Sequence, residues 1–175
     1  MAFPIFIFFR EIISIMPSST FLSKFEKFDR SFQEFDIEDP KEDQISRIAE
    51  KIDELRKLCW LNLGVSRNKE NMRKFLNNIQ DDISQLQKNA LLSTLEKIKF
   101  DQKIKLSERN RRALNLLLDL KNRQITTITL LKACLFREES RGGHYRDDFP
   151  DKDKNWECHS RQQLDQKIQK RFIKN

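Results

Sequence analysis

Apolar residues recur at helical spacing along most of the chain after residue 39. The clearest run starts beside Pro40, a residue that suits the first turn of a helix, and stops at Gly64, a common helix terminator. Its apolar positions lie three or four residues apart, at Ile45, Ile48, Ile52, Leu55, Cys59 and Leu63. This spacing predicts an amphipathic helix between residues 39 and 64.

A second helix is predicted immediately afterwards. Ser66 or Asn68 can cap its N-terminus, because both side chains accept a hydrogen bond from backbone amides of the first turn. One face of this helix carries Met72, Phe75, Leu76, Ile79, Ile83 and Leu86. Asn89 interrupts the pattern, and the apolar positions then resume at Leu91, Leu92, Leu95 and Ile98.

Ser107 opens the longest periodic segment, which we expect to continue to about Glu139 before Gly142 and Gly143 terminate it. The segment is either one helix or two helices joined near Asn122. Its apolar positions are Leu114, Leu117, Leu118, Ile125, Ile128, Leu131 and Leu135. The predicted fold class is all-α: an antiparallel bundle of three to five helices, followed by an irregular C-terminal tail.

The two ends of the chain differ from this helical centre. Residues 1–38 form an N-terminal apolar segment and linker, in which phenylalanines from Phe21 to Phe35 are spaced by four and three residues. That stretch is either a helix or an irregular segment, and the apolar residues before it form a strand, a short helix or a surface for a neighbour. We expect residues 39–160 to form the bundle domain and residues 161–175 a basic tail that is a short helix or frayed.

Composition narrows the possible functions. The chain of 175 residues has three glycines, against roughly a dozen at the usual frequency of about 7%. Gly-rich phosphate-binding fingerprints are therefore excluded within it. Three widely spaced cysteines indicate a reducing compartment, and we expect a cytoplasmic protein. The early apolar run is shorter than the roughly 18–20 residues that span a bilayer, so no membrane span is expected.

Positive charge is concentrated in residues 97–136, which contain ten cationic against three acidic residues. This window could bind nucleic-acid phosphates, meet an acidic partner surface or face solvent. Nucleic acid is disfavoured because aromatic residues for base stacking are sparse there. No metal site is predicted either, because His144, Cys158 and His159 are the only close trio and two of them are adjacent.

The densest polar run covers residues 137–150, which place arginines and carboxylates around a Gly-Gly break. Arg141 and Arg146 could bind a carboxylate with both guanidinium nitrogens, and His144 titrates near neutral pH unless its surroundings shift it. One interpretation is a pocket for an anion. The alternative, which the residues alone favour, is a loop whose charges pair among themselves and with a docked neighbour.

This run resembles the C-terminal signature of the flavoprotein family that includes L-aspartate oxidase and succinate dehydrogenase/fumarate reductase. The positions that match are Arg137, Glu139, Ser140, Arg141, Gly142, His144, Arg146, Asp148, Pro150, Trp156 and His159. A second motif of the same family matches at Leu55, Arg56, Trp60, Gly64 and Arg67. The occurrence of two motifs in the same order as in the family argues against a chance match. The short tail after His159 is more similar to that of L-aspartate oxidase.

The resemblance implies a C-terminal helical domain whose signature residues dock onto a flavin-binding domain, in the same or a separate chain. Full-length members use FAD, and L-aspartate oxidase oxidises L-aspartate to iminoaspartate for NAD biosynthesis. Because the flavin and capping domains have no counterpart here, no catalytic, cofactor-binding or metal residue carries over. We expect a truncated or split gene product that is inactive alone. Alternatives are the dehydrogenase/reductase branch, or a stand-alone helical adaptor or nucleic-acid-binding protein.

Overall fold

The computed structural model describes residues 32–33, 37–97, 103–163 and 166–172. The N-terminal apolar segment, most of the phenylalanine pattern and Ile98 lie outside these residues. The chain divides into two compact units. The first, Met1–Phe35 with Ile98–Lys105, contains a parallel pair of two-residue strands, β1 (Phe32–Gln33) and β3 (Lys103–Ile104).

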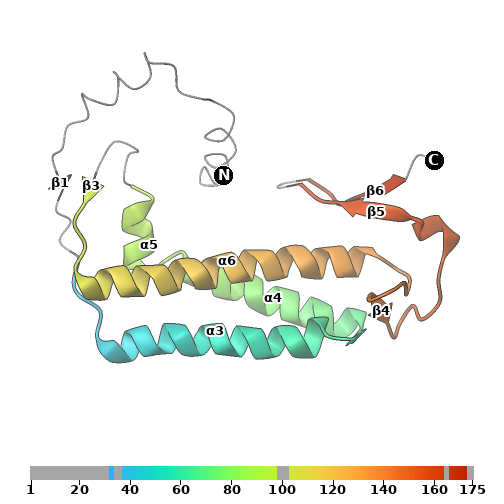
Figure 1. The fold of residues 1–175 in the computed structure, drawn as a ribbon, viewed down its shortest axis with the longest axis horizontal. Helices are drawn as coiled ribbons and strands as arrows, with labels where there is room; N and C mark the ends of the chain where they lie inside the picture. The colour runs from blue at the N-terminus through green and yellow to red at the C-terminus, as the bar shows by residue number, and fades with distance from the viewer. Residues whose placement is uncertain (1–31, 34–36, 98–102, 164–165, 173–175) are drawn as a thin grey trace, which may run out of the picture. The chain divides into compact units, whose positions relative to one another are not determined.

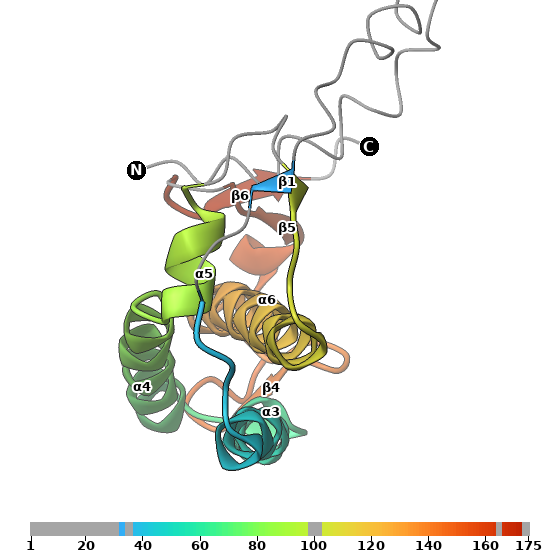
Figure 2. The same cartoon turned by 90° about the vertical axis from the view of Figure 1, so that its left-hand side faces the viewer.

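The second unit contains all four helices that the structure describes. Three are long and one is short: α3 (Glu42–Leu63), α4 (Lys69–Leu86), α5 (Ala90–Leu95) and α6 (Glu108–Phe136). In Figure 1, α4 runs opposite to both α3 and α6. Seen nearly end-on in Figure 2, the three long helices occupy the corners of a triangle. The predicted all-α bundle is confirmed.

The helix starts follow the polar residues that precede them. Asn68 caps α4, its side-chain oxygen accepting from the Asn71 amide at 2.9 Å. Ser107 caps α6 by accepting from the Asn110 amide at 3.0 Å. Each cap satisfies an amide that has no partner within its helix. Of the two caps considered for α4, Asn68 is the one used, since Ser66 belongs to a short strand.

The core lies where α6 packs against the other helices, and it uses the predicted apolar faces of α3 and α4. On α6 the prediction is only partly correct, because Ala113, Leu120 and Cys134 are buried whereas Ile125 is 36% exposed. One cluster joins Leu55, Met72, Phe75, Ile79, Leu120, Leu131 and Cys134. A second joins Ile45, Leu91, Leu92, Ala113 and Leu117. Burying each large aliphatic or aromatic side chain contributes about 1.5–3 kcal/mol, so these faces hold the helices together.

Two predictions about the C-terminal third are wrong. The longest segment is one helix, but it ends at Phe136, before the expected Glu139 and the glycine pair. The described residues of the tail form no helix and are not frayed: β5 (Cys158–Arg161) and β6 (Gln169–Phe172) pair as an antiparallel hairpin, after a 3₁₀ turn η2 (Lys154–Trp156). The Lys170 ammonium anchors this hairpin, lying 3.4 Å from the centre of the Trp156 ring.

Candidate functional site at the end of the bundle

The two motifs that stand far apart in the sequence meet at one end of the bundle. The strand β2 (Ser66–Arg67) pairs in parallel with β4 (Tyr145–Arg146), at the end where α3 and α6 finish (Figure 1). The Asp147 amide extends this pairing by donating to the Arg67 carbonyl at 2.9 Å. We call residues 64–67 and 137–150 the motif junction.

Arg146 explains why α6 ends where it does. Its side chain is fully buried, and one guanidinium nitrogen donates to the carbonyls of Cys134, Leu135 and Arg137 at 3.3, 3.1 and 2.9 Å. These carbonyls belong to the last turn of α6 and to its C-cap, Arg137, and lack partners within the helix. A cation also suits the negative end of the helix dipole. Arg146 therefore caps the C-terminal end of α6, which lies at Phe136.

Asp148 compensates the buried charge of Arg146. The Arg146 Nε donates to the Asp148 carboxylate at 2.9 Å, and a second guanidinium nitrogen bonds the other carboxylate oxygen. This pairing lowers the pKa of Asp148. The Phe149 ring covers the guanidinium, whose carbon lies 4.7 Å from the ring centre. A buried arginine without such partners would be strongly destabilising.

Glu139 is the second buried charge of the junction. It is 1% exposed, and its carboxylate accepts from Arg137, from Arg141 at 2.9 and 3.1 Å, and from the Asp153 amide at 3.0 Å. The bond from Arg141 is the largest of the effects that lower the pKa of Glu139 to about 2. The carboxylate therefore stays ionised at neutral pH and holds two arginines in place.

Arg137 links the junction to the segment that follows it. Its guanidinium donates to the Trp156 carbonyl at 3.0 Å and to the Cys158 carbonyl at 2.5 Å, besides its bond to Glu139. The Trp156 ring is buried and meets the Phe136 ring edge-on, with centroids 5.2 Å apart. One arginine thus fixes η2 and the start of β5 to the end of α6.

His144 joins the two motifs through its ring. Its Nδ1 lies 3.3 Å from an Arg67 guanidinium nitrogen, which also donates to the Gly143 carbonyl at 3.2 Å. Its Nε2 lies 3.4 Å from the Arg137 carbonyl. A neutral ring protonated at Nε2 satisfies both contacts. Burial is the main cause that lowers the pKa of His144, and the nearby arginines lower it further.

Two positions of the motifs require glycine, each for a different structural reason. Gly142 has a φ of 57°, in the left-handed region that favours glycine. It occupies a tight turn in which Arg141 and His144 exchange both backbone hydrogen bonds. Gly64 follows α3, and a Cβ there would lie 2.4 Å from the Trp60 carbonyl oxygen. Any larger residue would therefore have to displace the last turn of α3.

Other motif residues remain at the surface. Arg56 pairs only with Asp53, its neighbour on α3, at 2.7 Å among the described residues. His159 and Pro150 are exposed, and nothing in the structure explains Pro150. Around the end of α3, four large side chains are exposed: Trp60 by 75%, Leu61 by 70%, Val65 by 80% and Tyr145 by 43%. We call these four residues the end patch.

The geometry answers the question that the sequence left open about residues 137–150. Their charges pair among themselves, because Glu139 binds Arg137 and Arg141 while Asp148 binds Arg146. The forked donors that could have held an anion are engaged. Two contributors were not predicted from the sequence: Asp153, whose amide completes the Glu139 site, and Phe149, which covers Arg146. Neither carried a recognisable signal.

Part of the basic window of the sequence is paired where it is described. Arg111, Arg112 and Arg123 bind Glu108, Glu42 and Asp119, and Lys121 lies 3.7 Å from Glu96. No group of three histidine, cysteine or acidic side chains in the described part of the chain could hold a metal ion. No described helix is long and apolar enough to cross a membrane.

Comparison with known proteins identifies the family in which both motifs occur together with this helical domain. The family described as fumarate reductase flavoprotein C-term matches residues 52–174. The chain is 35% identical over 111 residues, 61% of its length, to an L-aspartate oxidase of Synechocystis. It is 31% identical over 122 residues, 69% of its length, to one chain of the fumarate reductase (CoM/CoB) of Methanothermobacter marburgensis. An L-aspartate oxidase of Pyrococcus furiosus is 29% identical over 99 residues, 57% of the chain.

The chain spans a fifth or less of the length of these relatives. The matches span 20% of the Synechocystis and Methanothermobacter proteins and 14% of the Pyrococcus protein. The family match at residues 52–174 includes α4, α6 and the motif junction. The buried network of Glu139, Arg146 and their partners therefore lies within the part of the chain that the family match covers.

Proposed function

The chain belongs to the fumarate reductase flavoprotein C-terminal domain family, and on this premise we propose that it is the helical domain of an FAD-dependent oxidoreductase of the L-aspartate oxidase type. In this role it does not perform the chemistry. It docks through the motif junction and the end patch onto a flavin-binding domain, in the same or a separate chain. The complete enzyme would oxidise L-aspartate to iminoaspartate and so serve NAD biosynthesis.

The observation that carries this proposal is the contrast between a buried polar network and exposed apolar side chains beside it. Arg146 and Glu139 are buried and held by ion pairs, which makes the junction a rigid support. Next to it, Trp60 and Leu61 are mostly exposed. Tryptophan and other large side chains that lie on rigid supports often dominate protein interfaces. The end patch therefore suits a docked domain.

The described residues do not fit FAD themselves. A dinucleotide site needs a Gly-rich turn between a strand and a helix of a parallel sheet. The longest described strands have four residues, and they form a hairpin. We therefore assign the flavin, whose ring accepts the electrons when it is bound, to the partner domain. The helical domain contributes by completing and stabilising the folded enzyme.

Reconstitution tests this function. The chain is mixed with the flavin-binding and capping domains of the Synechocystis L-aspartate oxidase, which are expressed separately. FAD retention and L-aspartate oxidation by the mixture are then measured. We expect the chain to raise both, and we expect the chain alone to show neither. Failure of the chain to associate with flavin-binding domains of this type would contradict the proposal.

A matched pair of leucine substitutions separates docking from folding. Leu61→Ala removes a 70%-exposed side chain of the end patch, and Leu130→Ala removes a 50%-exposed side chain of α6. We expect Leu61→Ala to weaken association with the flavin domain by about fivefold or more, as for an interface residue that contributes about 1 kcal/mol. Leu130→Ala should leave the association unchanged. If both substitutions weakened the association equally, the end patch would not be part of the interface.

The dehydrogenase/reductase branch is a second candidate. The similarity to the Methanothermobacter fumarate reductase (CoM/CoB) covers more of the chain than the similarity to either L-aspartate oxidase reported above. The reconstituted protein distinguishes the two branches by its substrate. Reduction of fumarate by a reduced dye, without oxidation of L-aspartate, would assign the chain to the reductase branch.

A further inference from the structure

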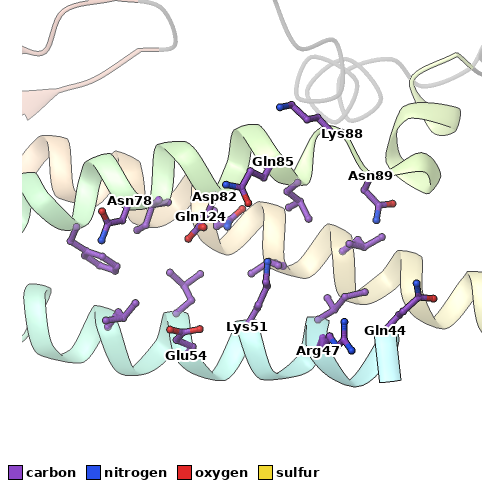
Figure 3. Close-up of a pocket in the computed structure, with 18 residues that line it drawn as sticks. Gln44, Arg47, Lys51, Glu54, Asn78, Asp82, Gln85, Lys88, Asn89 and Gln124 are labelled. Atoms are coloured by element: carbon purple, nitrogen blue, oxygen red, sulfur yellow. The ribbon is translucent and has the colours of Figure 1, made fainter. Parts of the chain in front are cut away.

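Two hollows in the described surface differ in the charges that border them. The first, of about 540 Å³, lies between α3 and α4 (Figure 3). Its apolar lining already belongs to the core, since Phe75 and Ile79 are 3% and 2% exposed, and its border mixes cations such as Lys51 with carboxylates such as Glu54. The second, of about 800 Å³, is lined by residues 159–162 and 169–171 of the C-terminal hairpin, which include cations but no carboxylate.

The hairpin of β5 and β6 (Figure 1) has an inner and an outer face. On β5, Cys158 is buried, and on β6 the Lys170 ammonium lies over the buried Trp156 ring. Because successive side chains of a strand point to opposite sides, the residues at alternate positions point away from the bundle. These residues are all exposed, and we call them the outer face: His159, Arg161, Gln169 and Arg171.

The strand register brings the two arginines of the outer face within reach of one ligand. Arg161 pairs with Gln169, and His159 pairs with Arg171. Arg161 and Arg171 are therefore diagonal neighbours, a relation in which residues of an antiparallel pair lie about 7–8 Å apart. Like charges at this separation repel each other, and an anion bound between them would replace that repulsion with attraction.

The hairpin has few acidic residues of its own to pair with these arginines. Residues 158–175 contain five cationic residues against one acidic residue, Asp165. Neither Arg161 nor Arg171 makes a hydrogen bond or an ion pair with any residue that the structure describes. The outer face also lacks an aromatic ring on which a nucleic-acid base could stack. Its chemistry therefore favours carboxylates over a nucleic acid.

The hairpin also offers free strand edges. Its sheet consists of β5 and β6 alone, and no backbone hydrogen bond joins either strand to another described segment. An exposed edge of this kind can pair with an extended chain. A second copy of the hairpin would bring the same positive charges and be repelled, whereas an acidic extended chain would be attracted. Edge and charge together select the same occupant.

We propose that the outer face of the hairpin binds an extended acidic segment of a partner protein. Side chains two residues apart in an extended segment lie on the same side, about 6.5 Å from each other, which is close to the separation of the two arginines. One carboxylate at each of these positions accepts from Arg161 or Arg171, and His159 and Gln169 add further hydrogen-bond donors. The site shares no residue with the motif junction or the end patch.

Two short synthetic peptides of identical composition test the site against the full chain. Both carry the same glutamates among threonines and valines. The first has them at alternate positions, so that they share one side of an extended chain, and the second has them consecutively. We expect the first peptide to bind more tightly by at least about fivefold, measured by fluorescence anisotropy. Equal affinities, or no binding of either peptide to the folded chain, would overturn the proposal.

The double variant Arg161→Gln, Arg171→Gln locates the binding. It removes both guanidinium groups of the outer face, so the first peptide should bind it no more tightly than the second. Arg73→Gln, Arg109→Gln is the matched control, because it lowers the net charge equally at exposed positions of α4 and α6. The control should keep the native affinity. Equal weakening in both double variants would show that net charge rather than the hairpin attracts the peptide.

Folding of the hairpin variant is checked in a Trp60→Phe background. The emission of Trp156, whose buried ring lies beneath Lys170, should be the same with and without the two substitutions. A single-stranded oligonucleotide with as many charges as the peptides is the last comparison. If it bound more tightly than the first peptide and lost this binding in Arg161→Gln, Arg171→Gln, the partner would be a nucleic acid and the proposal would be wrong.

Discussion

The role of a charged residue in this chain depends on whether it is buried together with an oppositely charged or hydrogen-bonding partner. Arg141 and Arg146 look equivalent in the sequence, yet Arg146 is fully buried and Arg141 keeps about a third of its side chain exposed. The sequence could indicate that residues 137–150 pair internally, since opposite charges lie two residues apart. It could not say which arginine is buried, because that depends on where the last carbonyls of α6 point.

Glu139 gives the first prediction at this scale. Glu139→Gln removes the charge that holds Arg137 and Arg141, and we expect it to lower the free energy of unfolding by up to about 3 kcal/mol. Glu138→Gln, at the exposed neighbouring position, should have little effect. Urea denaturation measures both. Equal stabilities of the two variants would contradict the central place of Glu139 in the network.

The same residue predicts how stability depends on acid. Because the folded pKa of Glu139 lies near 2, below its ordinary value of 4.5, its contribution is complete above about pH 4.5. The contribution is lost as the pH falls toward 2. The thermal midpoint of the native chain should therefore fall more steeply over this range than that of Glu139→Gln. Parallel curves would show that other carboxylates carry the acid sensitivity.

His144 predicts a second pH dependence with a different window. Its pKa is lowered in the folded chain, so the unfolded chain binds a proton first as the pH falls below about 6.5. Stability should decline from about pH 6.5 downward and be unaffected by this ring above it. His144→Asn, which keeps an acceptor for Arg67, should remove the decline. The other histidine, His159, is exposed, and His159→Asn should preserve it.

At the scale of elements, helices were predictable because their information is local. Periodic apolar positions and polar caps such as Asn68 and Ser107 fix where α4 and α6 begin. The hairpin of β5 and β6 was not predictable, since Cys158–Arg161 and Gln169–Phe172 are mostly polar and show no clear alternation. Their pairing depends on backbone hydrogen bonds and on contacts with Trp156 that sequence patterns do not reveal.

The cap of α4 gives a prediction for a whole element. Asn68→Ala should lower the free energy of unfolding by about 1 kcal/mol, because the Asn71 amide loses its partner at the helix start. Asn77→Ala is the matched control, since Asn77 lies exposed within α4. Alanine favours a helix interior more than asparagine does, so the control should be neutral or slightly stabilising. Thermal unfolding followed by circular dichroism distinguishes the two signs.

At the scale of the molecule, the bundle and the motif junction are stabilised by different kinds of interaction. The apolar faces of the helices build the core. In the junction, ion pairs hold residues 137–150 together, and strand pairing and the Arg67–His144 contact join this segment to residues 64–67. Arg67 reaches His144 only because α3 and α6 finish at the same end. A rigid junction of this kind positions the end patch, which the chain's own described residues leave mostly exposed.

The two tryptophans allow this division to be measured. Trp60 is 75% exposed in the end patch, whereas Trp156 is 8% exposed beneath Lys170. In Trp156→Phe, the fluorescence of Trp60 should be quenched readily by acrylamide, and adding a flavin-binding domain should shift its emission to the blue and protect it. Trp60→Phe should report a shielded ring throughout. If Trp60 stayed accessible in a complex that retains FAD, the helical domain would have to dock through another surface, because burial of the end patch is what the proposed interface requires.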